Sequence, residues 1–386
     1  MVIVTPLGLG LPWPLHSNYP VLSSGKGVNR LCVLNERPSE LEEIMRSFTS
    51  LPELRRMMGL LERLPQTNYR SFPAAMATLH SPQEAIDPVN GGYTNLNRCG
   101  LRFGYTVPAH ACTEGGGTFP LSAVLSVIDD ASTWAVIAAD RVRRPGVSVL
   151  LKVERLRPAP IEPGERLTVV SHVSKVGKAM GFLAARVLDE SGKVVAWGSH
   201  IKYMPMPPGW DIAFGRAYPL TRRLASLFAR PAHGDAMSVA PEGEAANPPL
   251  LPLLQRGGSQ AAAGDSVHMS IFDVAPEHLN GMPLALAGMH GGCQAMVHEV
   301  LAAEAAAAAT GVAGLQCHAI ELSYLSSGRV GTHSCAVDKP TMGVTANTVL
   351  TTSCIRSGDD GRGRVVSSAR ATFAACRATA TATLRL

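Results

Sequence analysis

The sequence lacks the markers of several classes of protein. Its eight cysteines are widely spaced and include no Cys-x-x-Cys pair, whereas a zinc site or a disulfide framework needs tighter grouping. Its most apolar stretches, Phe119 to Ile128 and Leu301 to Ala309, are bounded or broken by acidic residues and fall short of the roughly 20 uncharged residues that span a membrane. We therefore expect free or buried thiols, no metal, no redox cofactor and no membrane span.

Charge is also scarce. Only 17% of the residues are charged, 5% are aromatic, and the net charge of +5 is spread over 386 residues. The basic residues form no stripe with aromatics between them, so a nucleic-acid partner is not expected. An apolar fraction of 46% allows large buried cores, and the length suits two or three domains.

The first 95 residues predict little beyond helices. They hold no charged segment followed by an apolar core, so secretion is not expected. Residues 1–35 have no acidic residue, as in a weak transit peptide, which leaves an intracellular address that is cytoplasmic or mitochondrial. Ser39 and Glu42 have capping-box spacing, and apolar residues recur at helical intervals up to Leu61. We expect a helical hairpin followed by a loop up to about residue 95.

Residues 96–206 have the pattern of an α+β domain. The expected elements are a helix from Leu121 to Ala139 and strands at Val147 to Leu156, Arg166 to Lys175, Gly181 to Leu188 and Lys193 to Tyr203. Turn residues at Glu190 to Gly192 join the last two runs as a hairpin. One helix followed by an antiparallel meander predicts a sheet wrapped around that helix.

A similar pattern returns in residues 266–386. It follows a linker, residues 207–265, that is rich in proline, alanine and glycine and has one short helical piece near Leu220 to Ala229. The expected elements are a helix from Gly291 to Ala309 and strands at Leu315 to Leu325, Gly331 to Val337, Val344 to Ile355 and Arg364 to Cys376. The chain therefore divides into a leader, a first domain, a linker and a second domain.

The two domains align by a constant offset. Pro120 falls on His290 and Asp129 falls on Glu299, both 170 residues later. A constant offset across a helix and the strands that follow indicates a duplicated domain. Two copies are too few for a solenoid, so we expect a pseudo-symmetric dimer within one chain.

Three motifs carry a resemblance to a known family. They are His290-Gly291-Gly292 with a carboxylate nine residues beyond the histidine, the run Pro145 to Val149, and the run Ser171 to Lys178. In these motifs the chain resembles the hotdog-fold acyl-CoA thioesterases, in particular the small phenylacetate-pathway type and its mammalian mitochondrial relatives. The likeness covers residues 96–206 well and 266–376 more loosely. It implies a double hotdog with an N-terminal helical extension, acting as an acyl-CoA thioesterase without a cofactor.

The resemblance also implies composite sites between the two copies. His290 and Glu299 lie roughly 13 Å apart along one helix, too far to act on the same carbonyl group. In the family, the helix start of one copy meets the carboxylate of the other. The better site would combine His290, Gly291 and Gly292 with Asp129 and Ser148. A glycine amide would hold the thioester oxygen, Asp129 would act as general base or nucleophile, and Ser148 would orient water.

The second site departs from the family pattern. Pro120, Leu121 and Ser122 stand where the histidine and glycines should be, opposite Glu299 and Cys317, so a degenerate site is expected. The family's carbonyl-polarising asparagine, six residues before the histidine, is Glu114 in the first copy and Leu284 in the second. Asn280 is a candidate to replace this asparagine, through a longer loop. Lys175 and Lys178 resemble the residues that bind the phosphates of coenzyme A.

Two other functions remain open. The bulky second site and the missing asparagine favour a non-catalytic hotdog scaffold within a larger assembly. A hydratase on the same fold would carry a histidine five residues after its aspartate, but Trp134 and Ala135 occupy those positions after Asp129 and Asp130. We expect acyl-CoA as the partner, and a homodimer of double hotdogs is possible.

Overall fold

The computed structural model describes ten segments of the chain. They are residues 52–57, 84–86, 100–113, 117–206, 208–228, 266–280, 288–312, 314–343, 348–359 and 361–375. Glu114, Leu284 and most of the predicted leader and linker therefore lie outside the described residues.

The described strands form one twelve-stranded sheet in which every neighbouring pair is antiparallel. The first half contains β1 (Glu84–Ile86), β2 (Gly100–Thr106), β3 (Val147–Arg155), β4 (Arg166–Val176), β5 (Met180–Leu188) and β6 (Val194–Tyr203). The second contains β7 (Ser266–Val274), β8 (Leu315–Tyr324), β9 (Gly331–Asp338), β10 (Thr341–Met342), β11 (Thr348–Ser357) and β12 (Val365–Ala375). The order is β1-β2-β4-β5-β6-β3-β8-β12-β11-β9-β7, with β10 on β11.

The two halves meet where β3 pairs with β8. Lys152 lies opposite Glu321, which is 169 residues later, close to the offset that relates the two copies in sequence. On either side, the partners are Leu150 with Ser323 and Glu154 with Ala319, so the register is symmetric about the central pair. Each strand thus meets its own counterpart, as in an isologous contact about a two-fold axis.

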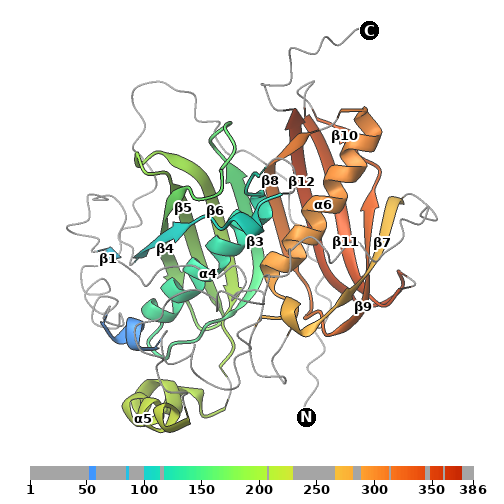
Figure 1. The fold of residues 1–386 in the computed structure, drawn as a ribbon. Coiled ribbons are helices and arrows are strands. Elements are labelled where there is room, and N and C mark those ends of the chain that lie inside the picture. Colours follow the sequence, from blue (N-terminus) through green and yellow to red (C-terminus); the bar gives the residue numbers. More distant parts are fainter. Residues whose placement is uncertain are drawn as a thin grey trace, which may run out of the picture.

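Two long helices lie on one face of this sheet (Figure 1), α4 (Leu121–Ala139) and α6 (Gly291–Thr310). They pack against each other and against the strands of their own halves. Although α4 is long and apolar enough to span a membrane, 83% of its most apolar window is buried inside the protein. The burial explains its composition, because a helix covered on all sides is apolar all round.

Most predicted elements match the structure, but four strands, β1, β2, β7 and β10, do not appear in the prediction. Helix α4 begins and ends at the predicted residues, and α6 extends one residue further. In the second copy, β11 is described from Thr348, and the predicted start at Val344 lies outside the described residues. The strands β2 and β7 precede the helices and were not expected individually. The three-residue strand β1 falls in the predicted loop, because pairing with the edge of β2 rather than its own pattern makes it a strand.

Parts of the leader and linker contact each other. Residues 52–57 are helical, as predicted, and Leu54 is fully buried in the core. The neighbouring Glu53 accepts hydrogen bonds of 2.6 and 2.7 Å from Arg222 in α5 (Tyr218–Phe228). Shorter helical turns are η1 (Ala109–Ala111), η2 (Asp211–Arg216) and η4 (Pro276–His278).

The cysteines of the described residues are free, as the spacing indicates. Four are buried and one is partly exposed: Cys112, Cys293, Cys317, Cys335 and Cys354. Burial raises the pKa of each of these five thiols. They therefore behave as small core side chains rather than as reactive thiolates.

Candidate active site

The carboxylate of Asp129 is buried in the middle of α4. Only 7% of the residue is exposed, which rules out the alternative that it lies on a solvated helix edge beside Asp130. Its Oδ1 atom accepts a hydrogen bond of 3.1 Å from Ser148 on β3. The predicted pair of Asp129 and Ser148 is therefore brought together, by a helix and a strand of the same half.

Two further residues, His200 and Lys202, complete the surroundings of this carboxylate and were missed in the sequence. Their Nε2 and Nζ atoms each lie 3.6 Å from Asp129 Oδ1. Both come from β6, where alternate side chains face the helix. A histidine and a lysine on the inward phase of an otherwise apolar strand were the signal that could have identified them, because unpaired cations are rarely buried.

The Ser148 hydroxyl lies between His200 and Asp129. His200 Nε2 is 3.0 Å from Ser148 Oγ, and its Nδ1 is 2.6 Å from Ser132 Oγ on α4. In the tautomer that carries its proton on Nε2, His200 donates to Ser148, which leaves the single proton of that hydroxyl for Asp129. Lys202 Nζ donates to Thr133 Oγ1 at 2.7 Å and is held by α4 in the same way. The network fixes the carboxylate in one orientation.

The charges of the site favour an ionised aspartate. Burial acts to raise the pKa of Asp129, but the Lys202 ammonium, the neighbouring histidines and the Ser148 hydrogen bond bring that pKa below its ordinary value. Burial lowers the pKa of His200 to about 3, so this imidazole is neutral at pH 7. Burial also lowers the pKa of Lys202 from its ordinary value. A buried carboxylate in its basic form is the result.

The lowered pKa values of two buried histidines, His200 and His298, predict that the stability of the fold depends on pH. The pKa of His298, buried between Ser353 and Ser367, is also lowered to about 3 by burial. Below an unfolded pKa near 6.5 the unfolded chain takes up protons at His200 and His298 that the folded chain does not. Stability is therefore lost as the pH falls through the window from about 6.5 to about 3. From pH 7.5 to pH 6 these two histidines together should lower the unfolding free energy by about 1.5 kcal/mol.

Urea unfolding at the two pH values measures this change. The variant His298→Gln removes one of the titrating groups, so its unfolding free energy should fall less than that of the wild type between pH 7.5 and pH 6. A free energy that is the same at pH 6 and pH 7.5 would contradict the prediction.

The start of α6 faces Asp129 from the other half. His290 is the N-cap, and its Nδ1 accepts from the Gly292 amide at 3.0 Å, so that amide is already engaged. The Gly291 amide opens the helix and has no acceptor one turn earlier. A Cβ atom at position 291 would lie 3.0 Å from Asp129 Oδ2 and 2.7 Å from the Tyr324 hydroxyl. Only glycine allows this close approach of the carboxylate to the helix start.

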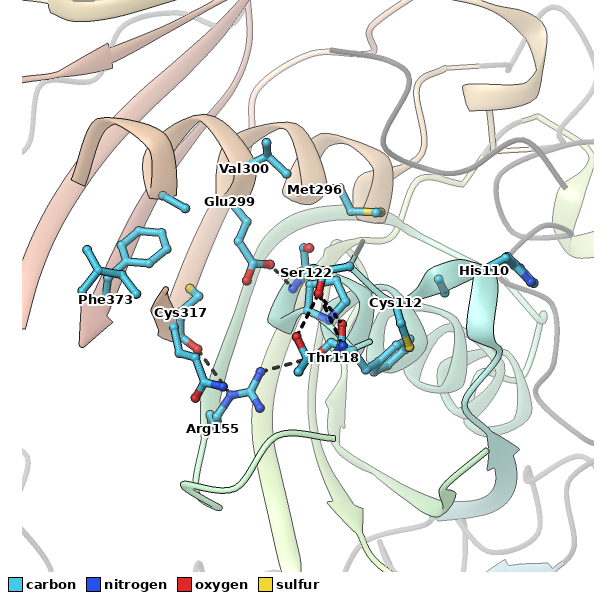
Figure 2. A pocket seen from close by; sticks show the side chains of 17 residues that line it. His110, Cys112, Thr118, Ser122, Arg155, Met296, Glu299, Val300, Cys317 and Phe373 are labelled. Carbon is cyan, nitrogen blue, oxygen red and sulfur yellow. Dashed lines mark hydrogen bonds between the residues drawn. The ribbon is translucent and has the colours of Figure 1, made fainter. Parts of the chain in front are cut away.

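The second predicted site also combines a carboxylate with a helix start, but here the carboxylate is hydrogen-bonded to the helix amides. The longer Glu299 side chain reaches the start of α4 and accepts from the Leu121 amide at 3.2 Å and the Ser122 amide at 2.6 Å. Figure 2 shows Glu299 extending from α6 toward Ser122, above Arg155 and Cys317. A cavity of about 160 Å³ lies beside it, with Cys317 and Phe373 in its wall. The helix start that a substrate oxygen would need is occupied by the protein's own carboxylate.

The pairing of equivalent strands shows which residues of the second site correspond to Ser148 and Lys202 of the first. Ser148 pairs with Lys202, and the equivalent pair between β8 and β12 is Cys317 with Phe373. The Cys317 thiol donates to the Ala319 carbonyl at 3.4 Å, and burial raises its pKa well above the ordinary value. The second site therefore lacks the serine and lysine of the first, and its thiol is not a nucleophile at neutral pH.

The remaining predicted site residues do not contact the Asp129 carboxylate or lie outside the described residues. Lys175, near the end of β4, and Lys178, in the turn before β5, are both exposed. The backbone amide of Asn280 donates to Gly288 at 2.9 Å, two residues before His290. Glu114 lies outside the described residues.

Comparison with known proteins shows that part of the chain is similar to acyl-CoA thioesterases, as the motifs indicate. Acyl-coenzyme A thioesterase 13 of Homo sapiens is 31% identical over 93 residues, and its Mus musculus counterpart is 32% identical over 89. These matches cover 24% and 23% of this chain and only 64% and 61% of the relatives' own length. No family model matches the chain.

One solved structure illustrates the structural likeness. An oleoyl thioesterase of Lactobacillus plantarum aligns with a TM-score of 0.47 and 12% identity. The alignment covers 72% of this chain and 97% of that one.

Proposed function

We propose that the protein is an acyl-CoA thioesterase, which hydrolyses acyl-CoA to a free acid and coenzyme A at one composite site between its halves. The observation that carries the proposal is the buried Asp129 carboxylate at the open start of α6, beside Gly291. A carboxylate facing helix amides pairs a base with donors for an oxyanion, which is the combination that hydrolysis of a thioester needs.

The chemistry follows from this placement. The thioester oxygen accepts from the Gly291 amide, where the positive end of the α6 dipole stabilises the developing negative charge. Asp129 takes a proton from water as the water oxygen bonds to the carbonyl carbon. When the carbon–sulfur bond breaks, that proton returns to the departing thiolate. Ser148, held by His200, keeps the carboxylate and water aligned.

The proposal includes the organisation of the chain. We interpret residues 96–206 and 266–386 as two hotdog domains that together form a double hotdog, with residues 1–95 as an N-terminal extension and 207–265 as the linker. Acyl chains would enter between the helices, and Lys175 and Lys178 would bind the phosphates of coenzyme A. The setting is intracellular, either cytoplasmic or mitochondrial, and a homodimer of double hotdogs fits this arrangement.

Release of free thiol from a panel of acyl-CoAs of different chain length tests the function. The full-length chain should hydrolyse at least one member of the panel, and His290→Ala should lower the rate because the cap that orients the first turn of α6 is lost. A folded wild type that releases no thiol from any member would overturn the proposal.

Removal of the Ser148 hydroxyl should have a moderate effect. In Ser148→Ala the carboxylate loses its hydrogen bond while Lys202 remains beside it, so we expect kcat to fall about tenfold with little change in KM. Steady-state kinetics measures the change. The matched variant Ser174→Ala alters an exposed serine on β4 and should keep the wild-type rate. Equal rates for Ser148→Ala and wild type would remove Ser148 from the site.

One observation favours the alternative of a non-catalytic scaffold. Glu299 uses the start of α4 as a permanent contact between the halves, so one of the two symmetric positions serves structure. Under that alternative, the Asp129 position would also serve structure, and the panel would give no thiol release from a folded chain.

A further inference from the structure

The proposed oxyanion site lacks the family's asparagine at its expected positions in the sequence. The family that the sequence resembles polarises the carbonyl with an asparagine six residues before the histidine, and this chain has Glu114 and Leu284 at those positions. The Gly292 amide is engaged by His290, which leaves the Gly291 amide as the backbone donor at the start of α6. A single donor leaves the developing charge partly unsatisfied.

Tyr324 places a hydroxyl at this point. It is the last residue of β8, and its Oη atom lies 2.7 Å from the position that a Cβ atom on Gly291 would take. Asp129 Oδ2 lies 3.0 Å from the same position, so the phenol, the carboxylate and the helix start converge. Within the described residues, the Tyr324 hydroxyl is buried and has no hydrogen-bond partner. Buried hydroxyls are normally paired, so an unpaired one facing a site points to a ligand.

We propose that the Tyr324 hydroxyl is the second donor to the thioester oxygen and, with the Gly291 amide, forms the oxyanion hole. This inference rests on the proposed thioesterase function and identifies a catalytic residue for it. The hydroxyl keeps its proton at neutral pH, because burial and the neighbouring Asp129 charge raise the pKa of Tyr324 well above its ordinary value. It therefore acts as a neutral donor.

The second predicted site supports this role for the position. The strand-end residue equivalent to Tyr324 is Arg155, 169 residues earlier. Its Nη2 donates to the Phe119 carbonyl at 3.4 Å, just before the N-cap of α4. In both halves this residue therefore faces the helix start of a predicted site. Glu299 fills the second helix start with a carboxylate and has a cation nearby, whereas the first helix start is paired with a neutral donor.

The test is the kinetics of Tyr324→Phe, which removes only the hydroxyl. With the best substrate of the panel, kcat should fall about 100-fold while KM stays within about threefold. Tyr105→Phe is the matched control, because it removes a buried phenol oxygen from β2 in the core and should keep the wild-type kcat. Thermal unfolding of both variants checks that the fold is intact.

A second measurement separates catalysis from packing. A CoA thioether without a carbonyl group should bind the wild type and Tyr324→Phe equally. A CoA trifluoromethyl ketone, which presents an oxyanion-like oxygen, should bind the variant about 100-fold more weakly. Equal loss of affinity for both ligands, or a wild-type kcat in Tyr324→Phe, would overturn the assignment while leaving the thioesterase function intact. A folded wild type without thiol release that binds neither ligand would overturn both.

Discussion

Asp129→Asn should lower kcat for acyl-CoA hydrolysis about 1,000-fold. The change keeps the shape of the side chain and an oxygen that can accept from Ser148, but it removes the basic form. Positioned general bases contribute about 10²–10⁴-fold to rate, and no other carboxylate among the described residues is hydrogen-bonded to Ser148. Free-thiol release under substrate saturation measures the effect.

The neighbouring residue offers a matched control. Asp130→Asn makes the same chemical change one position along α4, where the residue is only half-buried, and should keep kcat within a fewfold of the wild type. Asp129→Asn also leaves the buried Lys202 without its counter-charge, so its unfolding free energy must be measured alongside the rate. A folded Asp129→Asn variant with the wild-type kcat would show that the base is elsewhere.

The pH dependence of the wild type adds an independent check. Because the Lys202 ammonium, the neighbouring histidines and the Ser148 hydrogen bond hold the pKa of Asp129 below its ordinary value, its basic form persists into the acid range. His200, with a pKa of about 3, does not change charge near neutrality. The rate should therefore have no acid limb near pH 6.5, where an exposed histidine would produce one.

The sequence predicted the parts of the site that recur in patterns. The alignment of Pro120 with His290 identified both helix starts, and the alignment of Asp129 with Glu299 identified both carboxylates. In the structure, Pro120 is the N-cap of α4 and His290 is the N-cap of α6. These positions were predictable because duplication leaves a constant offset and helix geometry fixes where each residue lies along the helix.

The parts that could not be predicted depend on contacts between elements. His200 and Lys202 stand on β6, more than sixty residues from Asp129, and only the wrapping of the sheet around α4 brings them to the carboxylate. Tyr324 belongs to the other half and reaches Gly291 at the end of β8. No local pattern encodes such distances, since they follow from strand order and register.

The occupation of the second site by Glu299 also depends on three-dimensional distance. The offset predicts that Glu299 corresponds to Asp129, and the bulk of Leu121 predicts a degenerate site. What closes that site is the extra methylene of glutamate, which carries the carboxylate onto the Leu121 and Ser122 amides. The shorter Asp129 instead stays beside Gly291 within a polar network. The side chains of Asp129 and Glu299 differ by one methylene, and this difference decides whether the carboxylate stays free to act as a base or caps a helix.

Glu299→Ala should accordingly destabilise the fold by about 3 kcal/mol without lowering hydrolysis at the first site. The variant removes two charge-assisted hydrogen bonds, each worth about 1.5–3 kcal/mol, and leaves the positive end of α4 without an anion. No compensation is available nearby, because the N-cap is Pro120, whose side chain accepts no hydrogen bond. Relaxation of the helix end and entry of water keep the loss below the sum of these contributions.

Glu304→Ala is the matched control for this loss. It removes a carboxylate from the same helix, but Glu304 is exposed and, within the described part of the chain, forms an ion pair with His268, so its loss should cost less than about 1 kcal/mol. Urea unfolding of the three proteins gives the free energies, and thiol release gives kcat. A Glu299→Ala variant that keeps its stability but loses activity would make Glu299 a catalytic group and the second site the working one. If Glu299→Ala loses stability but keeps the wild-type kcat, the role of Glu299 is to join the two halves, because its carboxylate on α6 accepts hydrogen bonds from amides at the start of α4.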